Sequence, residues 1–246
     1  MNSELNLNKL IRGFIIHSVH EPARTAHVNE LLQQWPGIER IEAIYPAQQK
    51  IPFLQKIQDA ALQRTGKILT HGEIGVLLTN RLIWKKILMT PVPDDFPFLI
   101  LESDSLMLQP QLLQTHFYAL AGTCDLFYFG GWLGHIQLFR SSRKKWAKQF
   151  WVGEPYINTL CSGYGYAVNK KAAALMLQRT KQVGYAFDEV RRYMKQDELH
   201  LGAIVSEWIT QKPGESAIGN RPVFFISDKI WRMVLDIRNY FICWFK

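Results

Sequence analysis

The chain contains few cysteines and no long apolar run. Its three cysteines, Cys124, Cys161 and Cys243, are odd in number and widely spaced, which argues against a disulfide framework and against a cysteine-based zinc site. No stretch of about 18 apolar residues is present, so no membrane-spanning helix is expected. The first residues also lack the basic start and apolar run of a signal peptide. We therefore expect a cytoplasmic protein, and peripheral contact with the inner face of a membrane stays open.

Several catalytic signatures are missing as well. The seven histidines form no i, i+4 pair that encloses an acid, so a zinc hydrolase site is not expected. The chain has no Gly-x-x-x-x-Gly-Lys-Ser/Thr run, which excludes a P-loop enzyme. It also has no Gly-x-Ser-x-Gly run, which excludes the nucleophile elbow of serine hydrolases.

What is present is typical of one globular domain with an excess of positive charge. Hydrophobic residues make up 48% and charged residues 20% of the 246 residues, which is ordinary for a folded domain. The net charge of +8 attracts anions such as nucleotide phosphates, acidic glycolipids, membrane surfaces or nucleic acid. The densest basic cluster is interpreted as a solvated helix face; it comprises Arg140, Arg143, Lys144, Lys145 and Lys148.

Strand and helix patterns alternate along the chain and predict an α/β fold with a parallel βαβ opening. Predicted strands cover 13–16, 38–45, 98–101, 125–129, 164–168 and 222–226. Predicted helices cover 23–35, 51–65, 74–89, 110–121 and 170–180, and 188–208 reads as largely helical. Thr70 to Glu73 and Asn169 have the residue types of helix N-caps.

The last predicted helix, 230–245, is aromatic and amphipathic. Its apolar positions are Ile230, Val234, Ile237, Phe241 and Trp244. Such a face either packs on the core or lies on a membrane surface, and core packing is the more common outcome.

A buried strand ends in two carboxylates. The run Leu99 to Leu101 is followed by Glu102, Ser103 and Asp104, and the spacing of two directs both acids to one side if the extended form continues. Ligands of open α/β sheets sit at the carboxyl ends of strands, and Mg²⁺ and Mn²⁺ prefer oxygen ligands. A metal that offsets the charge of a nucleoside diphosphate leaving group would suit this position. The alternative is a loop with two solvated acids.

Three segments resemble glycosyltransferase family 25, the family of lipopolysaccharide and lipooligosaccharide galactosyltransferases. These segments are Leu69 to Trp84, Leu101 to Asp104 and Tyr164 to Ala173. The resemblance covers roughly residues 11 to 190 and implies a single GT-A-like α/β domain, with a Rossmann-like mixed sheet flanked by helices. It also implies a UDP-sugar donor, most often UDP-galactose, and inversion at the sugar carbon.

The resemblance assigns roles to several residues. Asp104 matches the metal-coordinating acid, supported by Glu102, for Mn²⁺ or Mg²⁺. Glu73 matches the acid of the family's Gly-Glu-Ile-Gly segment, between Gly72 and Gly75, where glycine permits close approach of the backbone. The chain departs from the pattern at Val76, at Thr79-Asn80 in place of Ser-His, and at Ser103 in place of an aspartate.

Further site residues are expected on the acceptor side. Asp188 is the candidate general base for the acceptor hydroxyl, with Asp197 and Glu198 as alternatives, whereas Asp125 is interpreted as structural. Trp132 either stacks on a sugar ring or packs in the core. Arg24 either binds the diphosphate or is a surface helix residue.

Together these features predict a glycosyltransferase that moves a hexose from a UDP-sugar to a glycan or glycolipid. The domain 1–246 would comprise a nucleotide-sugar-binding half at about 11–130, an acceptor half at about 131–227 and the amphipathic helix at 228–246. Two alternatives stay open. One is transfer to modified nucleic acid, whose phosphates would suit the basic charge; the other is a catalytically silent nucleotide-sugar-binding protein.

Overall fold

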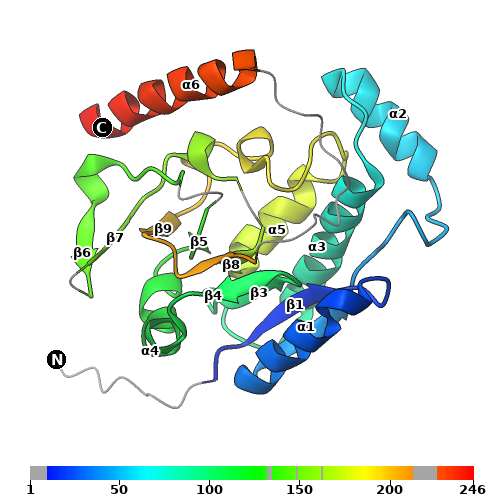
Figure 1. Ribbon diagram of the computed structural model, residues 1–246, viewed down its shortest axis with the longest axis horizontal. Helices are drawn as coiled ribbons and strands as arrows, with labels where there is room; N and C mark the ends of the chain where they lie inside the picture. Colours follow the sequence, from blue (N-terminus) through cyan, green and yellow to red (C-terminus); the bar gives the residue numbers. More distant parts are fainter. Residues whose placement is uncertain (1–9, 132–134, 148, 162, 213–225) are drawn as a thin grey trace.

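An eight-stranded mixed sheet forms the centre of the protein in a computed structural model (Figure 1). The structure describes residues 10–131, 135–147, 149–161, 163–212 and 226–246, with side chains of the last segment described from Val234 onward. The strand order is β2-β1-β3-β8-β5-β9-β7-β6. The strands of this sheet are β1 (Gly13–His17), β2 (Ile38–Glu42), β3 (Phe98–Glu102), β5 (Leu126–Tyr128), β6 (Lys144–Trp146), β7 (Phe150–Gly153), β8 (Gly165–Val168) and β9 (Leu201–Val205).

Strand direction brings several loops to one edge of this sheet. β1 pairs in parallel with β2 and β3, whereas β8 runs antiparallel between β3 and β5. β9 is again parallel to β5. The ends of β1, β2, β3, β5 and β9 and the start of β8 therefore share an edge, which is where α/β sheets bind ligands.

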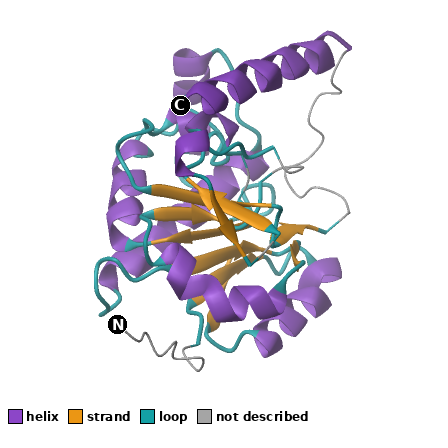
Figure 2. Cartoon of the chain, turned by 90° about the vertical axis from the view of Figure 1, so that its left-hand side faces the viewer, coloured by secondary structure: helices purple, strands orange, loops and turns teal. Residues whose placement is uncertain are grey.

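Helices cover both faces of the sheet (Figure 2). On one face, α3 (His71–Met89) and α5 (Lys170–Arg179) pack on alternate strand residues that include Phe14, Ile100 and Tyr166. On the other, α1 (Pro22–Gln34) and α4 (Pro110–Ala121) pack on the intervening residues, among them Ile15 and Leu101. The central strands, such as β3, β8 and β9, are buried on both sides, which explains their nearly continuous apolar sequences.

Smaller elements complete the domain. A two-stranded ribbon of β4 (Ser105–Met107) and β10 (Ile209–Gln211) follows the acidic end of β3. α2 (Leu54–Thr65) packs near the start of α3. The short helices are η2 (Arg140–Ser142), η3 (Ile157–Thr159) and η4 (Val190–Arg192), and α6 (Ile226–Phe245) ends the chain. No helix in the described part of the chain is both long and apolar enough to span a bilayer.

The predicted fold class, a single α/β domain with a mixed sheet flanked by helices, is confirmed. Both predicted caps are present. Thr70 and Glu73 form a reciprocal capping box on α3, and the Asn169 side chain accepts a hydrogen bond from the backbone N–H of Ala172. These short-range signals succeed because capping depends on residues three apart in sequence.

Two predictions of secondary structure are wrong. The stretch 188–208 contains η4 and then strand β9, which lies buried between β5 and β7. A short apolar run such as Leu201–Val205 fits a buried strand as well as a helix, and pairing within the sheet decides.

The basic cluster does not form one helix face either, because Arg140 lies in η2, and Lys144 and Lys145 lie in β6. Lys148 is outside the described residues. The predicted strand 222–226 also falls outside them except for Ile226, which begins α6.

Candidate active site

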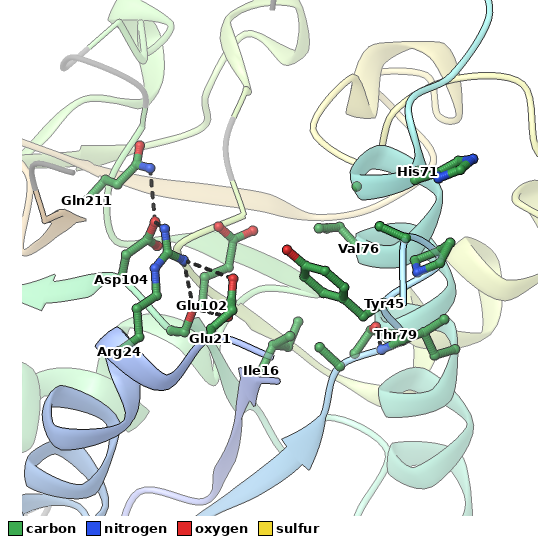
Figure 3. A pocket seen from close by; sticks show the side chains of 16 residues that line it. Ile16, Glu21, Arg24, Tyr45, His71, Val76, Thr79, Glu102, Asp104 and Gln211 are labelled. Carbon is green, nitrogen blue, oxygen red and sulfur yellow. Dashed lines mark hydrogen bonds and ion pairs between the residues drawn. The ribbon is translucent and has the colours of Figure 1, made fainter. Parts of the chain in front are cut away.

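A pocket of about 250 Å³ opens at the shared sheet edge, between α1 and the start of α3 (Figure 3). One wall is polar and comes from the ends of β1 and β3, the first turn of α1 and strand β10. The other wall comes from the segment after β2 and from α3. The lining residues that the argument uses are Glu21, Arg24, Tyr45, Glu102, Asp104 and Gln211.

Arg24 organises the polar wall from the first turn of α1. Its guanidinium lies 3.1 Å from Asp104 Oδ2 and 3.7 Å from Glu21 Oε1, and donates a 2.8 Å hydrogen bond to Ser103 Oγ. Ser103 Oγ in turn donates to Glu21 Oε2 at 3.1 Å. Asp104 is buried, and its Oδ2 also accepts a 3.0 Å hydrogen bond from Gln211 Nε2. Arg24 is thus a pocket residue and not a surface helix residue.

Glu102 lies behind Arg24 and Asp104, at the end of β3. Part of its side chain faces the pocket, but the surrounding protein desolvates the carboxyl and raises its pKa to about 8. The negative charges of Asp104, Asp188 and Glu21 contribute to this rise in pKa, whereas Arg24 opposes it. Glu102 and Asp104 thus line one pocket, and the charge of Asp188 acts on Glu102.

Two glycines allow this packing. A Cβ at Gly163 would lie 2.4 Å from Glu102 Oε1 and 2.8 Å from the Phe187 ring. A Cβ at Gly75 would lie 2.4 Å from the carbonyl oxygen of Ile44. Any side chain at these positions would push Glu102 or the segment after β2 out of place, because such contacts are far below van der Waals distance.

The opposite wall is mostly apolar. It includes Ile16, Ala43, Pro46 and Val76, and the Tyr45 side chain lies among them, facing the acids in Figure 3. The departure at Thr79-Asn80 has a structural explanation in this region.

Thr79 Oγ1 donates to the Gly75 carbonyl and accepts from the Ile44 backbone N–H, which holds the segment after β2 against α3. Asn80 is buried and accepts a 2.6 Å hydrogen bond from the Tyr166 hydroxyl. Both side chains are therefore occupied in connecting α3 to its neighbours.

Other predicted site residues lie away from the acids. The Glu73 carboxylate accepts hydrogen bonds from Thr70 N and Oγ1 in the capping box, although Gly72 beside it lines the pocket. Glu198 pairs with Arg179, and Asp197 is exposed. Trp132 lies outside the described residues.

Asp125 is structural, as predicted. It accepts hydrogen bonds from Asn169, Lys171 and the His200 backbone N–H. Burial alone would raise its pKa, but these donors lower it overall.

The pocket residues that were not predicted include Glu21, Tyr45 and Gln211. Glu21 and Tyr45 follow the first two strands, so their position at strand ends was an available signal. Gln211 had no such signal, because its position depends on the antiparallel pairing of β10 with β4, about 100 residues apart.

The metal-binding capacity of the site is limited. Among the described residues, no group of three or more His, Cys, Asp or Glu side chains is arranged to hold a metal ion. However, Asp104 Oδ1 is buried, and among the described residues it has no hydrogen-bond partner. A buried carboxylate oxygen left in this way is costly unless a ligand satisfies it.

One comparison with known proteins identifies a family for this chain. The family model of glycosyltransferase family 25, described as lipopolysaccharide biosynthesis proteins, matches residues 11–191, well over half of the chain. A search of curated proteins gives no match. The matched segment contains β1 to β3, α1, α3, both acids at the end of β3, and Asp188. The chain therefore belongs to glycosyltransferase family 25.

Proposed function

We propose that the protein transfers a hexose, galactose in the first instance, from a UDP-sugar to a hydroxyl of a glycan acceptor such as lipopolysaccharide. The observation that carries this proposal is the pocket itself. It combines an apolar wall that suits a nucleoside with the Arg24, Glu102 and Asp104 cluster that suits a metal-bound diphosphate. Arginine recognises phosphate oxygens well because its donors are fixed in a fork.

A divalent cation would be held by Asp104 and Glu102. Mg²⁺ usually binds through one or two carboxylates together with substrate phosphates, so two acids suffice when the donor supplies the other oxygens. Asp104 Oδ1, which has no hydrogen-bond partner among the described residues, fits such a ligand. A bound cation would neutralise charge on the leaving diphosphate. It would also favour the ionised form of Glu102, whose pKa is raised by burial and by the neighbouring acids.

Asp188 is the proposed general base. In an inverting transfer the acceptor oxygen attacks the anomeric carbon, the bond from that carbon to UDP oxygen breaks, and the acceptor proton passes to a carboxylate. Asp188 is the one of the three candidate acids whose charge acts on Glu102. Asp197 is instead exposed, and Glu198 is paired with Arg179. Glu73 remains a weaker catalytic candidate because its carboxylate caps α3.

We expect the reaction to occur in the cytoplasm. Cys124, Cys161 and Cys243 are all free, and unpaired cysteines are typical of a reducing compartment.

The test is a thermal melt of the full chain with a panel of UDP-sugars, with and without Mn²⁺. A ligand at ~100 times its dissociation constant adds ~2.7 kcal/mol to stability. We expect one UDP-sugar to raise the midpoint only with Mn²⁺, and the Asp104→Asn variant to lose that shift. Absence of a shift with any UDP-sugar would refute the donor assignment. A shift without sugar transfer or donor hydrolysis would favour the alternative of a catalytically silent binding protein. The observation behind this alternative is that Ser103 stands where the family has an aspartate.

A further inference from the structure

The C-terminal helix α6 exposes its apolar side chains instead of burying them. Six of them are between 41% and 84% exposed. This set, called the α6 face below, comprises Val234, Ile237, Tyr240, Phe241, Trp244 and Phe245. Positions three and four apart share one side of a helix, so these residues form a continuous stripe. The sequence-based expectation that this stripe packs on the core is therefore wrong for the side chains that the structure describes.

Among the described side chains of α6, Leu235 and Ile242 are partly buried. Asn239 and Cys243 are the buried residues of this segment. Asp236 lies 3.7 Å from His135, and the Cys243 thiol is 3.9 Å from the Gln137 carbonyl oxygen. Polar contacts thus join α6 to the domain, and most of the large apolar side chains described on this helix are exposed. This is the reverse of the usual arrangement for a helix on a globular domain.

Exposed basic residues lie on α6 and on the segment from η2 to β6, whose η2 end contacts α6. They form a group, called the basic rim below, of Arg140, Lys144, Lys145, Arg238 and Lys246. Arg140 lies over the Trp244 ring at 4.2 Å, and Lys246 lies over the Phe139 ring at 4.8 Å. η2, which carries Arg140, lies against α6 and leads directly into β6 with Lys144 and Lys145 (Figure 1). On β7 next to it, Trp151 is 42% exposed and has Lys145 over its ring.

We propose that α6 docks the enzyme on an anionic membrane surface, with the α6 face in the acyl boundary and the basic rim at the headgroups. Aromatic and aliphatic residues flanked by Lys and Arg are the composition of helices that lie in the membrane interface. Anionic lipid headgroups attract such basic residues. A second copy of the chain fits less well, because a two-fold contact through this face would bring two basic rims together. α6 lies beyond the family match at 11–191, so this docking surface is independent of the sugar donor and of the pocket.

The experiment is co-sedimentation of the full chain with vesicles of phosphatidylglycerol and phosphatidylethanolamine, compared with vesicles of phosphatidylcholine alone. We expect binding to the anionic vesicles that weakens with salt. The Ile237→Glu/Phe241→Glu variant should bind at least ~10-fold more weakly, because it removes two apolar groups that the membrane would bury. The Lys144→Glu/Lys145→Glu variant should lose about fivefold or more per residue.

The matched control is Leu82→Glu/Met89→Glu, which places the same two charges on exposed apolar positions of α3. This control should bind vesicles like the parent protein, and all variants should retain the parent melting midpoint in lipid-free buffer. Equal binding of the α6 variants and the parent would overturn the proposal. So would equal binding to both vesicle types, an α6-dependent dimer in solution without vesicle binding, or binding of duplex DNA in place of vesicles.

Discussion

At the carboxyl ends of β1 to β3 the chain buries charged groups, whereas along α6 it exposes aromatic ones. Asp104 is 7% exposed, but Phe241 is 52% exposed. Both regions invert the usual distribution of residues, in which charge is solvated and large apolar groups are buried. Buried carboxylates need a cation or hydrogen-bond donors, and an exposed apolar stripe needs a surface to cover it. The two proposals assign a different ligand to each region, a metal-bound nucleotide sugar to the buried acids and a membrane surface to the α6 face.

The largest expected effect concerns the buried acid. Asp104→Asn keeps the size of the side chain but removes the charge that faces Arg24, and we expect sugar transfer to fall by at least ~100-fold, because residues that merely orient metal ligands already cost about 10–100-fold. The measurement is the transfer rate at saturating donor and Mn²⁺. Asp95→Asn, at an exposed acid nearby in sequence, is the control and should leave the rate unchanged. Equal rates for Asp104→Asn and the parent would remove Asp104 from the site.

The next effect concerns pH. The pKa of Glu102 in the folded protein, about 8, lies above its ordinary value of 4.5, so the folded protein binds more protons than the unfolded chain between these values. Stability of the metal-free protein should then fall as pH rises from about 4.5 to 8 and level off above. Glu102→Gln removes this dependence. In thermal melts, the melting midpoint of the variant relative to that of the parent should be higher at pH 8 than at pH 5. An identical pH dependence in both proteins would contradict this.

A smaller effect separates capping from catalysis at the start of α3. Thr70→Ala removes the N-cap of α3 and should cost about 1 kcal/mol of unfolding free energy. Glu73→Gln retains an oxygen for the cap and should change neither stability nor transfer by much. Denaturant unfolding and the transfer rate measure the two effects. Loss of transfer in Glu73→Gln with unchanged stability would show instead that Glu73 is catalytic.

The smallest effect is on the exposed helix. Phe241→Ser changes a half-exposed residue and should alter stability in lipid-free buffer by less than about 0.5 kcal/mol. A loss several times larger, measured by denaturant unfolding, would mean that the α6 face is covered by the rest of the chain. The contrast with the buried acids would then disappear.

Local sequence determined the elements whose signals are short. The capping box at Thr70 and Glu73, the Asn169 cap and the apolar strand Phe98–Leu101 needed only neighbours a few residues away. The placement of Glu102 and Asp104 at a strand end followed from the same run, and the motifs at 69–84, 101–104 and 164–173 indicated the family that the match at 11–191 confirmed.

Tertiary structure decided everything that depends on distant partners. Leu201–Val205 forms a strand because it pairs with β5 on one side and β7 on the other. Gln211 contacts Asp104 because β10 pairs with β4. Periodicity showed that α6 has an apolar side but not which way that side faces, since contacts with η2 and with Gln137 set its rotation. A sequence pattern fixes which residues share a face, whereas the energy of long-range packing decides what that face meets.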